Sequence, residues 1–413
     1  MTMLQERDER SGALPVSGAS MPRRKILVIA SLAESLTGFR APLLSAMVAR
    51  GHCVTACAPA ADASIRSTLA RMGVEYRELP VDRAGLNPTR DVQLMLSLHR
   101  LMRESTPDIV LSYTAKPVIY GSLMARLCGV PEVFALITGL GYGFTATGPK
   151  ACLTRAVLRR LYRAGLRDNR VVFFQNPDDE RFFREIGLLR RQTRSVLVNG
   201  SGVDVEGFRP VPFPPSISFL MIARLLSLKG VHEYARAAQI VRARHPGVPF
   251  RLVGWIDDTP DAIREQDLRR WIDAGTIEFL GKLDDVRPAL ADASVYVLPS
   301  HREGTPRTVL EAMAMGRPVV TTDAPGCRET VKDGCNGFLV PVGDAQALAA
   351  ALERFILSPG LIEEMGRASR RVAVEKYDVH NVNTVMLSAM GLGALTGSSI
   401  ESKALGIADR RRI

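Results

Sequence analysis

Short apolar runs alternate with helical patterns along most of the chain, and this alternation limits the fold more than any other feature. The first unit is an apolar run at Lys25–Ala30 followed, after a polar turn through Gly38, by a helical pattern at Ala41–Arg50. Units of this kind continue to an apolar run at Glu132–Ile137. Strands that are apolar on both faces and alternate with helices are typical of doubly wound parallel sheets. The sequence therefore predicts an α/β fold with ligand contacts at the carboxyl ends of the strands.

A second alternating series follows a proline-rich segment, Phe208–Pro215. Its prolines remove backbone donors that a helix interior or a central strand needs. The second series starts with a strand at Ile217–Ala223 and a helix at Gly230–Arg244. A chain of 413 residues also exceeds the roughly 100 to 200 residues of an ordinary domain. We therefore expect two Rossmann-like domains that face each other across a cleft able to hold a nucleotide.

The domain boundaries follow from these patterns. We expect a disordered tail at 1–22, a first domain at 23–207, a linker at 208–216, a second domain at 217–377, a helix at 378–392 that can pack back on the first domain, and a flexible tail at 393–413. The chain has no apolar run long enough to span a bilayer, and its first twenty residues lack the apolar core of a secretory signal. The expected location is the cytoplasm. The six cysteines show no metal-ligand spacing, so neither a metal nor another cofactor is expected.

The positive charge of the chain is concentrated in its first half. Residues 1–200 hold 28 basic and 17 acidic groups, whereas residues 201–413 hold 26 of each. Such a field attracts a polyanion, an anionic membrane or a diphosphate substrate. The densest segment runs from Pro149 to Arg167, where basic residues interleave with leucines and no acid occurs. This pattern predicts a basic amphipathic helix that either lies on lipid headgroups or buries its apolar stripe in the core. In the first case the membrane contacts would be Arg155, Arg159, Arg160 and Arg163.

Two glutamates eight residues apart occupy the segment that follows the expected strand Val295–Leu298. We expect Thr305 and Pro306 to supply the N-cap and first residue of a helix, which Gly316 ends. Glu303 then lies in the loop and Glu311 lies inside the helix, so both can face a ligand at the helix N-terminus. A structural explanation also stays open, in which Glu303 stabilises the helix dipole and Glu311 lies on a solvated face.

The spacing of these glutamates resembles a known signature. The segments EGTPRTVLEAMAMGRPVV and GCRETVKDGCNGFLVPVGD look like the corresponding segments of retaining family 4 glycosyltransferases. The resemblance implies a GT-B fold, in which Glu303 lies by the sugar of a nucleotide-sugar donor and Glu311 binds the ribose. It also implies transfer with retention and without a metal. Further donor contacts are expected from Gly304, Thr305, Thr308 and Gly38.

A second match to this family lies in ARLLSLKG, residues 223–230. Arg224 ends the first strand of the second domain and Lys229 opens its helix. Positioned cations can neutralise a departing nucleoside diphosphate as its charge develops. The resemblance implies that Arg224 and Lys229 contact the donor phosphates. Taken alone, the two cations could also be surface charges at a turn.

The first domain resembles the branch of the family that builds bacterial surface polysaccharides on polyprenyl diphosphate. The matching segments are SYTAKPVIYGSLMARLCGVP, ITGLGYGF, FQNPDD and NGSGVDVEGFRP. Lys116 would suit an acceptor phosphate or a donor carbonyl group, and Gly139 and Gly141 would allow close backbone approach. Structural roles as a helix start and a turn stay open for these positions. Two departures stand out: Tyr113 occurs where many members have a loop histidine, and Gly38 stands alone where relatives often have a glycine pair.

These observations lead to one functional hypothesis and its alternatives. The main hypothesis is transfer of a hexose, N-acetylated, from a nucleoside diphosphate, with uridine favoured, to a polyprenyl-diphosphate-linked sugar at the inner face of the cell membrane. The alternatives are a nucleotide-sugar hydrolase or 2-epimerase on the same fold, or a non-catalytic nucleotide-binding partner protein. Nucleic acid is not an expected partner, because the basic half lacks the aromatic residues that interleave with cations in RNA-binding proteins.

Overall fold

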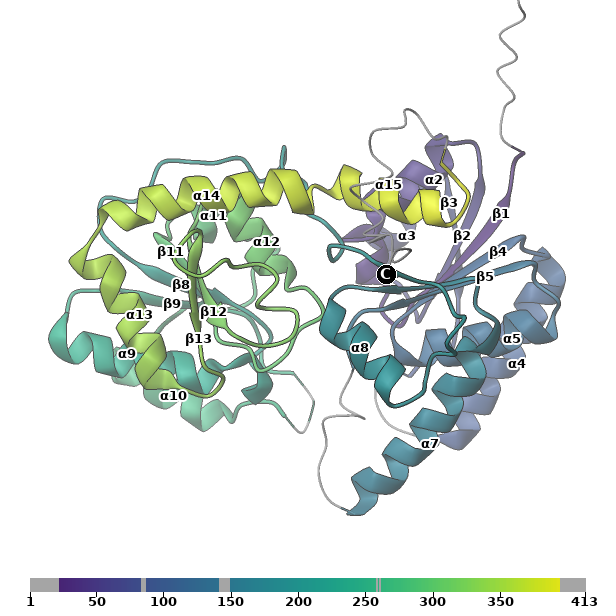
Figure 1. Cartoon of the computed structure of the whole chain (residues 1–413), viewed down its shortest axis with the longest axis horizontal. Helices are drawn as coiled ribbons and strands as arrows, with labels where there is room; N and C mark the ends of the chain where they lie inside the picture. Colours follow the sequence, from purple (N-terminus) through teal and green to yellow (C-terminus); the bar gives the residue numbers. More distant parts are fainter. Residues whose placement is uncertain (1–21, 83–86, 141–148, 258, 260, 394–413) are drawn as a thin grey trace, which may run out of the picture.

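The computed structural model describes residues 22–82, 87–140, 149–257, 259 and 261–393. It contains two α/β domains side by side (Figure 1). The first has a seven-stranded sheet in the order β3-β2-β1-β4-β5-β6-β7, and the second a six-stranded sheet in the order β10-β9-β8-β11-β12-β13. All pairs of neighbouring strands run parallel. The two doubly wound, Rossmann-like domains predicted from the sequence are confirmed.

The elements of the first domain follow the predicted alternation. Its strands are β1 (Lys25–Ile29), β2 (Cys53–Ala58), β3 (Val74–Glu78), β4 (Ile109–Tyr113), β5 (Glu132–Ile137), β6 (Val171–Phe174) and β7 (Ser195–Leu197). Its helices are α1 (Glu34–Thr37), α2 (Ala41–Ala49), α3 (Ala63–Arg71), α4 (Pro88–Ser105), α5 (Ser122–Leu127), α7 (Pro149–Gly165) and α8 (Pro177–Glu185). A π-turn, η1 (Pro117–Gly121), links β4 to α5, and a 3-10 turn, η2 (Leu166–Asp168), follows α7.

The second domain repeats this architecture. Its strands are β8 (Phe219–Ile222), β9 (Phe250–Val253), β10 (Glu278–Phe279), β11 (Val295–Leu298), β12 (Val319–Thr322) and β13 (Gly337–Val340). Its helices are α9 (Val231–Arg244), α10 (Glu265–Asp273), α11 (Arg287–Ala291), α12 (Arg307–Ala314), α13 (Ala345–Leu357) and α14 (Gly360–Tyr377), with a 3-10 turn, η3 (Ser227–Lys229), before α9. The sequence patterns did not predict α1, β6, α8, β7, α10 or β13. Most of these are short, and short segments carry little periodicity.

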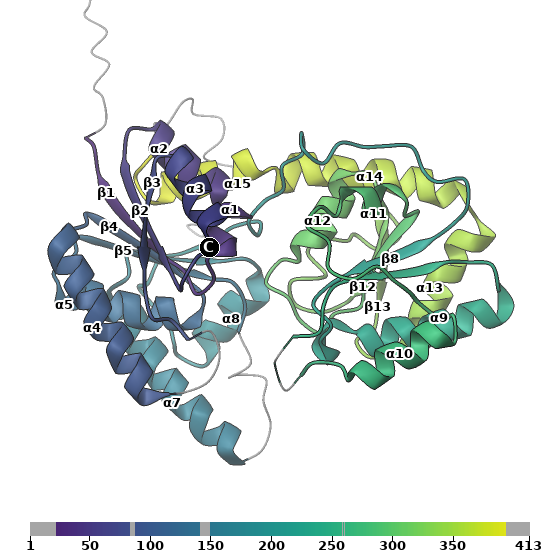
Figure 2. The ribbon, with the colours of Figure 1, turned by 180° about the vertical axis from the view of Figure 1, so that it is seen from behind.

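Helices cover both faces of the first sheet. Alternate residues of β1 point to opposite faces, so Ile26 and Val28 pack with α2 and α3 while Leu27 and Ile29 pack with α4, α5 and α7. Figures 1 and 2 show these two helix layers on opposite sides of the sheet. This double burial explains why the strands are apolar throughout.

The chain passes between the domains earlier than the predicted linker. Val198 packs in the core of the first domain, whereas Val203 already packs in the core of the second. The proline-rich segment lies on the second domain, because the buried guanidinium of Arg317 donates to the carbonyl oxygens of Val211 and Pro212 at 3.2 Å. The crossing therefore lies between Val198 and Val203, and the expected boundary at 208 was placed too late.

The last described helix returns to the first domain. Helix α15 (Val379–Ala389) continues from α14 and lies beside α2 (Figure 1). Its apolar side chains Val382, Met386 and Leu387 are buried in the core of the first domain. The expectation that residues 378–392 pack back on this domain is confirmed.

Across the described residues, no single helix is long and apolar enough to cross a membrane. Helices α13 and α14 pass the same length and composition test only as a pair, and they meet at 108°. Both helices bury apolar side chains in the core of the second domain.

Removal of the Met386 side chain should destabilise the first domain. We expect Met386→Ala to lower its free energy of unfolding by about 2–5 kcal/mol, because the substitution leaves a cavity in a closed core. Urea denaturation followed by circular dichroism measures the change. The control Asn381→Ala alters an exposed position of the same helix and should have an effect within about 0.5 kcal/mol. Equal stability of the Met386→Ala and wild-type proteins would contradict the docking of α15.

Candidate active site

A cleft of about 400 Å³ lies between the two domains. The first domain contributes residues that follow its strands, among them Thr114, Thr138 and Gln175. The second domain contributes Arg224 and the segment Glu303–Thr308. The volume falls in the range of small-molecule sites, and the carboxyl ends of parallel strands are where such sites form.

Two of the predicted catalytic residues pair with each other at this cleft. The ammonium group of Lys229, at the end of η3, forms an ion pair with the carboxylate of Glu303. Both side chains line the cleft and are mostly buried. The structure therefore brings together the cation predicted for the leaving phosphate and the carboxylate predicted for the sugar.

The third predicted catalytic residue, Arg224, is held by a carboxylate that the sequence analysis missed. Its Nη1 lies 2.6 Å from Oδ2 of Asp257. Asp257 follows β9, the strand beside β8, and a carboxylate after a parallel strand is a signal that could have identified it. This pair fixes the guanidinium at the wall of the cleft.

Glu311 lies one helical turn deeper than the residues that line the cleft. Its carboxylate accepts a hydrogen bond of 2.6 Å from Nε of Arg307, and only 6% of the residue is exposed. Burial raises the pKa of Glu311, and the neighbouring guanidinium of Arg307 offsets part of this shift. The alternative explanation from the sequence, that Glu311 lies on a solvated helix face, is therefore wrong.

The start of α12 differs from the prediction. Pro306 is the N-cap and Arg307 the first helical residue, without a side-chain cap. The predicted cap, Thr305, instead donates its hydroxyl to the carbonyl oxygen of Gln175 in the first domain at 3.0 Å. Thr308 donates to the carbonyl oxygen of Ile222 at 3.3 Å. Thr305 and Thr308 both line the cleft, and Gly316 ends the helix region with a φ of 75°, as predicted.

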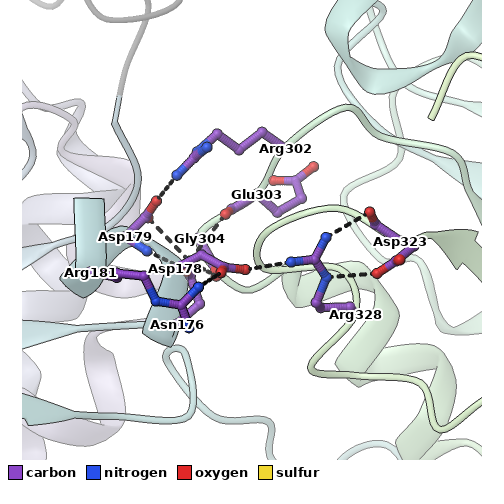
Figure 3. Close-up of polar contacts among 9 residues, drawn as sticks. All are labelled: Asn176, Asp178, Asp179, Arg181, Arg302, Glu303, Gly304, Asp323 and Arg328. Carbon is purple, nitrogen blue, oxygen red and sulfur yellow. Dashed lines mark hydrogen bonds and ion pairs between the residues drawn. The ribbon is translucent and has the colours of Figure 1, made fainter. Parts of the chain in front are cut away.

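The loop before α12 is tied to the first domain by an interdomain polar cluster (Figure 3). The Asn176 amide donates to the carbonyl oxygens of Gly304 at 2.8 Å and Glu303 at 3.3 Å. Arg302 forms an ion pair with Asp179, whose side chain is fully buried. We define the cluster as Asn176, Asp178, Asp179, Arg302 and Arg328.

The outer part of the interdomain polar cluster is a second ion pair. Nη1 of Arg328 lies 2.8 Å from Oδ2 of Asp178, and its Nε lies 2.7 Å from Oδ1 of Asp323 (Figure 3). Asp178 and Asp179 belong to the segment FQNPDD, which the sequence analysis noted only as a family mark. Asn176 also caps α8 by accepting a hydrogen bond of 2.7 Å from the Asp179 amide. The turn that contains Asn176 therefore both starts α8 and binds the second domain.

Gly304 is required by this close approach of the two domains. A Cβ atom at this position would overlap the Thr138 carbonyl oxygen and the Gln175 side chain. A donor contact of Gly304, as expected from the sequence, stays a prediction.

The first-domain side of the cleft is built around Tyr113. Tyr113 is the last residue of β4 rather than part of the following loop, and its hydroxyl lies 2.7 Å from Oγ of Ser35. Burial raises the pKa of Tyr113 to about 12. The next residue, Thr114, has a φ of 70°, which is rare outside glycine. Such backbone strain occurs at functional sites, and Thr114 lines the cleft.

The predicted contacts from the first domain lie at different distances from the cleft. Gly38 follows α1, and its neighbours Phe39 and Arg40, rather than Gly38 itself, line the cleft. Lys116 is not a lining residue, since its ammonium group lies 2.7 Å from Oδ1 of Asp91 and both side chains are nearly buried. Its role toward the acceptor stays a prediction.

The glycine pair predicted on the acceptor side is only partly described. Gly139 has a φ of 136°, a conformation that favours glycine. A Cβ atom there would lie 3.8 Å from the backbone nitrogen of Gly304, so the two loops approach each other closely. Gly141 lies outside the described residues.

The predicted basic helix is α7, and one of its sides faces the core of the first domain while the other is exposed. Tyr162 is buried, with Leu158 and Leu161 packed against the same core. Arg159 and Arg163 donate to the carbonyl oxygens of Ile186 at 2.9 Å and Gly187 at 2.8 Å. On the outer side, Leu153 is 70% and Val157 37% exposed. The helix thus has both a core-facing stripe and exposed apolar side chains, and Arg155 and Arg160 belong to the same basic segment.

The described residues contain no group of three or more His, Cys, Asp or Glu side chains that could hold a metal ion.

Two family models match the chain. The model described as glycosyl transferase 4-like domain matches residues 40–200, and the model described as glycosyl transferases group 1 matches residues 216–358. The first match lies in the first domain and the second match in the second domain.

Curated relatives cover most of the chain. N,N'-diacetylbacillosaminyl-diphospho-undecaprenol alpha-1,3-N-acetylgalactosaminyltransferase of Campylobacter jejuni is 27% identical over 358 residues, which is 83% of this chain and 92% of the relative. UDP-Gal:alpha-D-GlcNAc-diphosphoundecaprenol alpha-1,3-galactosyltransferase of Escherichia coli is 26% identical over 309 residues, which is 70% of this chain and 76% of the relative. Among solved structures, HepE of Anabaena in complex with UDP and glucose has a TM-score of 0.72 at 19% identity. The match covers 89% of this chain and 100% of the HepE chain.

Loss of the buried Asp179 carboxylate should free the loop before α12. Asp179→Ala leaves the Arg302 guanidinium without its acidic partner, and breaking a buried pair typically costs about 3–5 kcal/mol. We expect faster amide hydrogen exchange at residues 300–306, measured by mass spectrometry. Glu185→Ala removes an exposed carboxylate at the end of the same helix, outside the cluster, and serves as the matched control. Unchanged exchange in the Asp179→Ala protein would show that the cluster does not hold the loop.

Proposed function

The chain is a glycosyltransferase of family 4 with the GT-B fold, and we propose that it transfers an N-acetylated hexose from a nucleoside diphosphate, uridine favoured, to a polyprenyl-diphosphate-linked sugar with retention of anomeric configuration. The observation that carries this proposal is the convergence of Arg224, Lys229 and Glu303 on one interdomain cleft. The names of the two curated relatives support the acceptor class, because both act on diphospho-undecaprenol sugars.

The proposed chemistry uses the cations of the second domain at the leaving group. The bond between the anomeric carbon and the β-phosphate oxygen breaks, and the acceptor hydroxyl oxygen bonds to the same face of that carbon. The leaving phosphate takes the proton of the acceptor hydroxyl. Arg224 and Lys229 offset the negative charge that grows on the diphosphate. This charge stabilisation is the main contribution that the protein makes in the proposed reaction.

The carboxylates have separate tasks in this proposal. Glu303 orients the sugar and stabilises positive charge at the anomeric carbon, and Lys229 holds its carboxylate in place before the donor binds. Glu311 accepts the ribose hydroxyls. To reach them its side chain exchanges the Arg307 guanidinium for the ribose, which is feasible because both bind through charge-assisted hydrogen bonds.

We further propose that the layer formed by α4, α5 and α7 contacts the inner face of an anionic membrane. Five of the exposed large apolar side chains lie on these three helices: Val92, Leu96, Leu127, Leu153 and Val157. The same three helices carry Arg100, Arg103, Arg126, Arg155, Arg159, Arg160 and Arg163. Exposed apolar groups among arginines suit the boundary between acyl chains and lipid phosphates.

A donor screen tests the proposed reaction. The purified protein is incubated with single nucleotide sugars and a membrane extract, and mass spectrometry reports the mass added to polyprenyl-diphosphate sugars. We expect transfer from a UDP-N-acetylhexosamine, and a fall of about 100-fold or more in Arg224→Ala and Glu311→Ala. Arg269→Ala removes an exposed arginine of the second domain and should leave the rate unchanged. Donor turnover at the same rate without lipid would favour a hydrolase or 2-epimerase instead.

Vesicle binding tests the proposed membrane surface. Leu153→Asp combined with Val157→Asp places two carboxylates among the arginines and removes two apolar contacts of about 1.5–3 kcal/mol each when buried. We expect co-sedimentation with phosphatidylglycerol-containing vesicles to fall at least tenfold. Leu357→Asp changes an equally exposed leucine on α13 and is the control. Equal loss in the control, or none in the double variant, would rule out this surface.

A further inference from the structure

Arg40 differs from the other cations that line the cleft. Three of the four lining cations have acidic partners: Arg224 pairs with Asp257, Lys229 with Glu303 and Arg307 with Glu311. No ion pair joins Arg40 to an acid among the described residues. Its side chain is only 3% exposed, and its Nε and Nη2 atoms are buried without a hydrogen-bond partner in the part of the chain that the structure describes.

Two aromatic rings lie beside the Arg40 guanidinium, whose Nε and Nη2 atoms have no hydrogen-bond partner among the described residues. The guanidinium lies 5.2 Å from the ring centre of Tyr113 and 5.4 Å from that of Phe39. These cation–π contacts stabilise the charge but accept no strong hydrogen bond. Buried polar groups in proteins are nearly always hydrogen-bonded, so two unpartnered donors on one buried side chain call for a ligand.

The charge around Arg40 indicates the sign of that ligand. Burial is the main cause that lowers the pKa of Arg40 to about 10; Tyr113 opposes the shift and the cation Arg307 adds to it. The side chain therefore stays protonated at neutral pH. The guanidinium of Arg307, from the second domain, lies 5.8 Å from the centre of the same Phe39 ring. A buried cation that no acid compensates is unfavourable until an anion enters.

We propose that Arg40 binds the terminal phosphate of the nucleoside diphosphate, from the first-domain wall of the cleft. This inference rests on the proposed function, in which Glu311 holds the ribose within the second domain and Arg224 and Lys229 hold the diphosphate. The phosphate farther from the ribose then lies nearer the first domain, where Arg40 lines the cleft. A guanidinium presents paired donors that match a phosphate.

The binding by Arg40 joins the two domains through the donor. Arg224 and Lys229 belong to the second domain and Arg40 to the first, so a diphosphate bridges them. A nucleoside monophosphate lacks the bridging group. Preference for the diphosphate over the monophosphate is therefore the property that Arg40 should control.

Binding of UDP, GDP, UMP and GMP by isothermal titration calorimetry tests the inference without lipid or transfer. For whichever diphosphate the wild-type protein binds, we expect Arg40→Gln to weaken binding about 10- to 100-fold and to leave the matching monophosphate within twofold. Arg40→Lys keeps the charge and should recover part of the loss. Arg40 precedes α2 and Arg50 follows it, so Arg50→Gln removes an exposed arginine at the other end of that helix. The affinities of the Arg50→Gln protein should equal those of the wild type.

The outcomes separate this inference from the proposed function. Equal loss for diphosphate and monophosphate in the Arg40→Gln protein would assign Arg40 to packing of the cleft and overturn the inference. Unchanged diphosphate binding with a raised KM for the lipid acceptor would move Arg40 to the acceptor and also overturn it. Either result leaves the proposed function intact, provided that Arg224→Gln weakens diphosphate binding. Absence of binding to all four nucleotides by the wild-type protein would contradict the proposed function itself.

Discussion

The loop that carries Glu303 depends on contacts between its backbone and side chains of the first domain. The carbonyl oxygens of Glu303 and Gly304 accept hydrogen bonds from Asn176, and Gly304 fits only because it has no side chain. The buried pair of Arg302 and Asp179 adds a charged contact at the same point. The position of Glu303 relative to the first domain is therefore set by hydrogen bonds from the buried Asn176 side chain to the backbone of the loop and by the ion pair of Arg302 with Asp179.

The same loop organises the charges of the cleft. Glu303, Glu311 and Asp257 each pair with a cation that lines the cleft, so the second-domain side of the cleft is internally compensated. In the proposed reaction, an incoming diphosphate competes with Asp257 and Glu303 for Arg224 and Lys229, and Glu303 becomes free to accept sugar hydroxyls. The first domain adds Arg40, which has no such compensation among the described residues.

Two chain segments cross between the domains, and backbone hydrogen bonds join them. The amide of Val203 donates to the carbonyl oxygen of Tyr377 at 2.8 Å, and the amide of Val379 donates to that of Val203 at 3.0 Å. The outward crossing at Val198–Val203 and the return into α15 therefore lie together. Any change in domain orientation must turn about this pair, because α15 is anchored in the core of the first domain.

The sequence by itself determined the class of fold, the two-domain organisation and the residues Arg224, Lys229 and Glu303 that meet at the cleft. Alternating apolar runs and helical patterns carry this information, because each strand is buried on both faces. Only the tertiary structure decided what each side chain contacts. Thr305 donates a hydrogen bond to the Gln175 carbonyl oxygen instead of capping its helix, and Lys116 forms an ion pair with Asp91. The proline-rich segment packs on the second domain. These contacts join residues far apart in the chain, and sequence patterns report local periodicity rather than which distant groups satisfy one another's hydrogen bonds and charges.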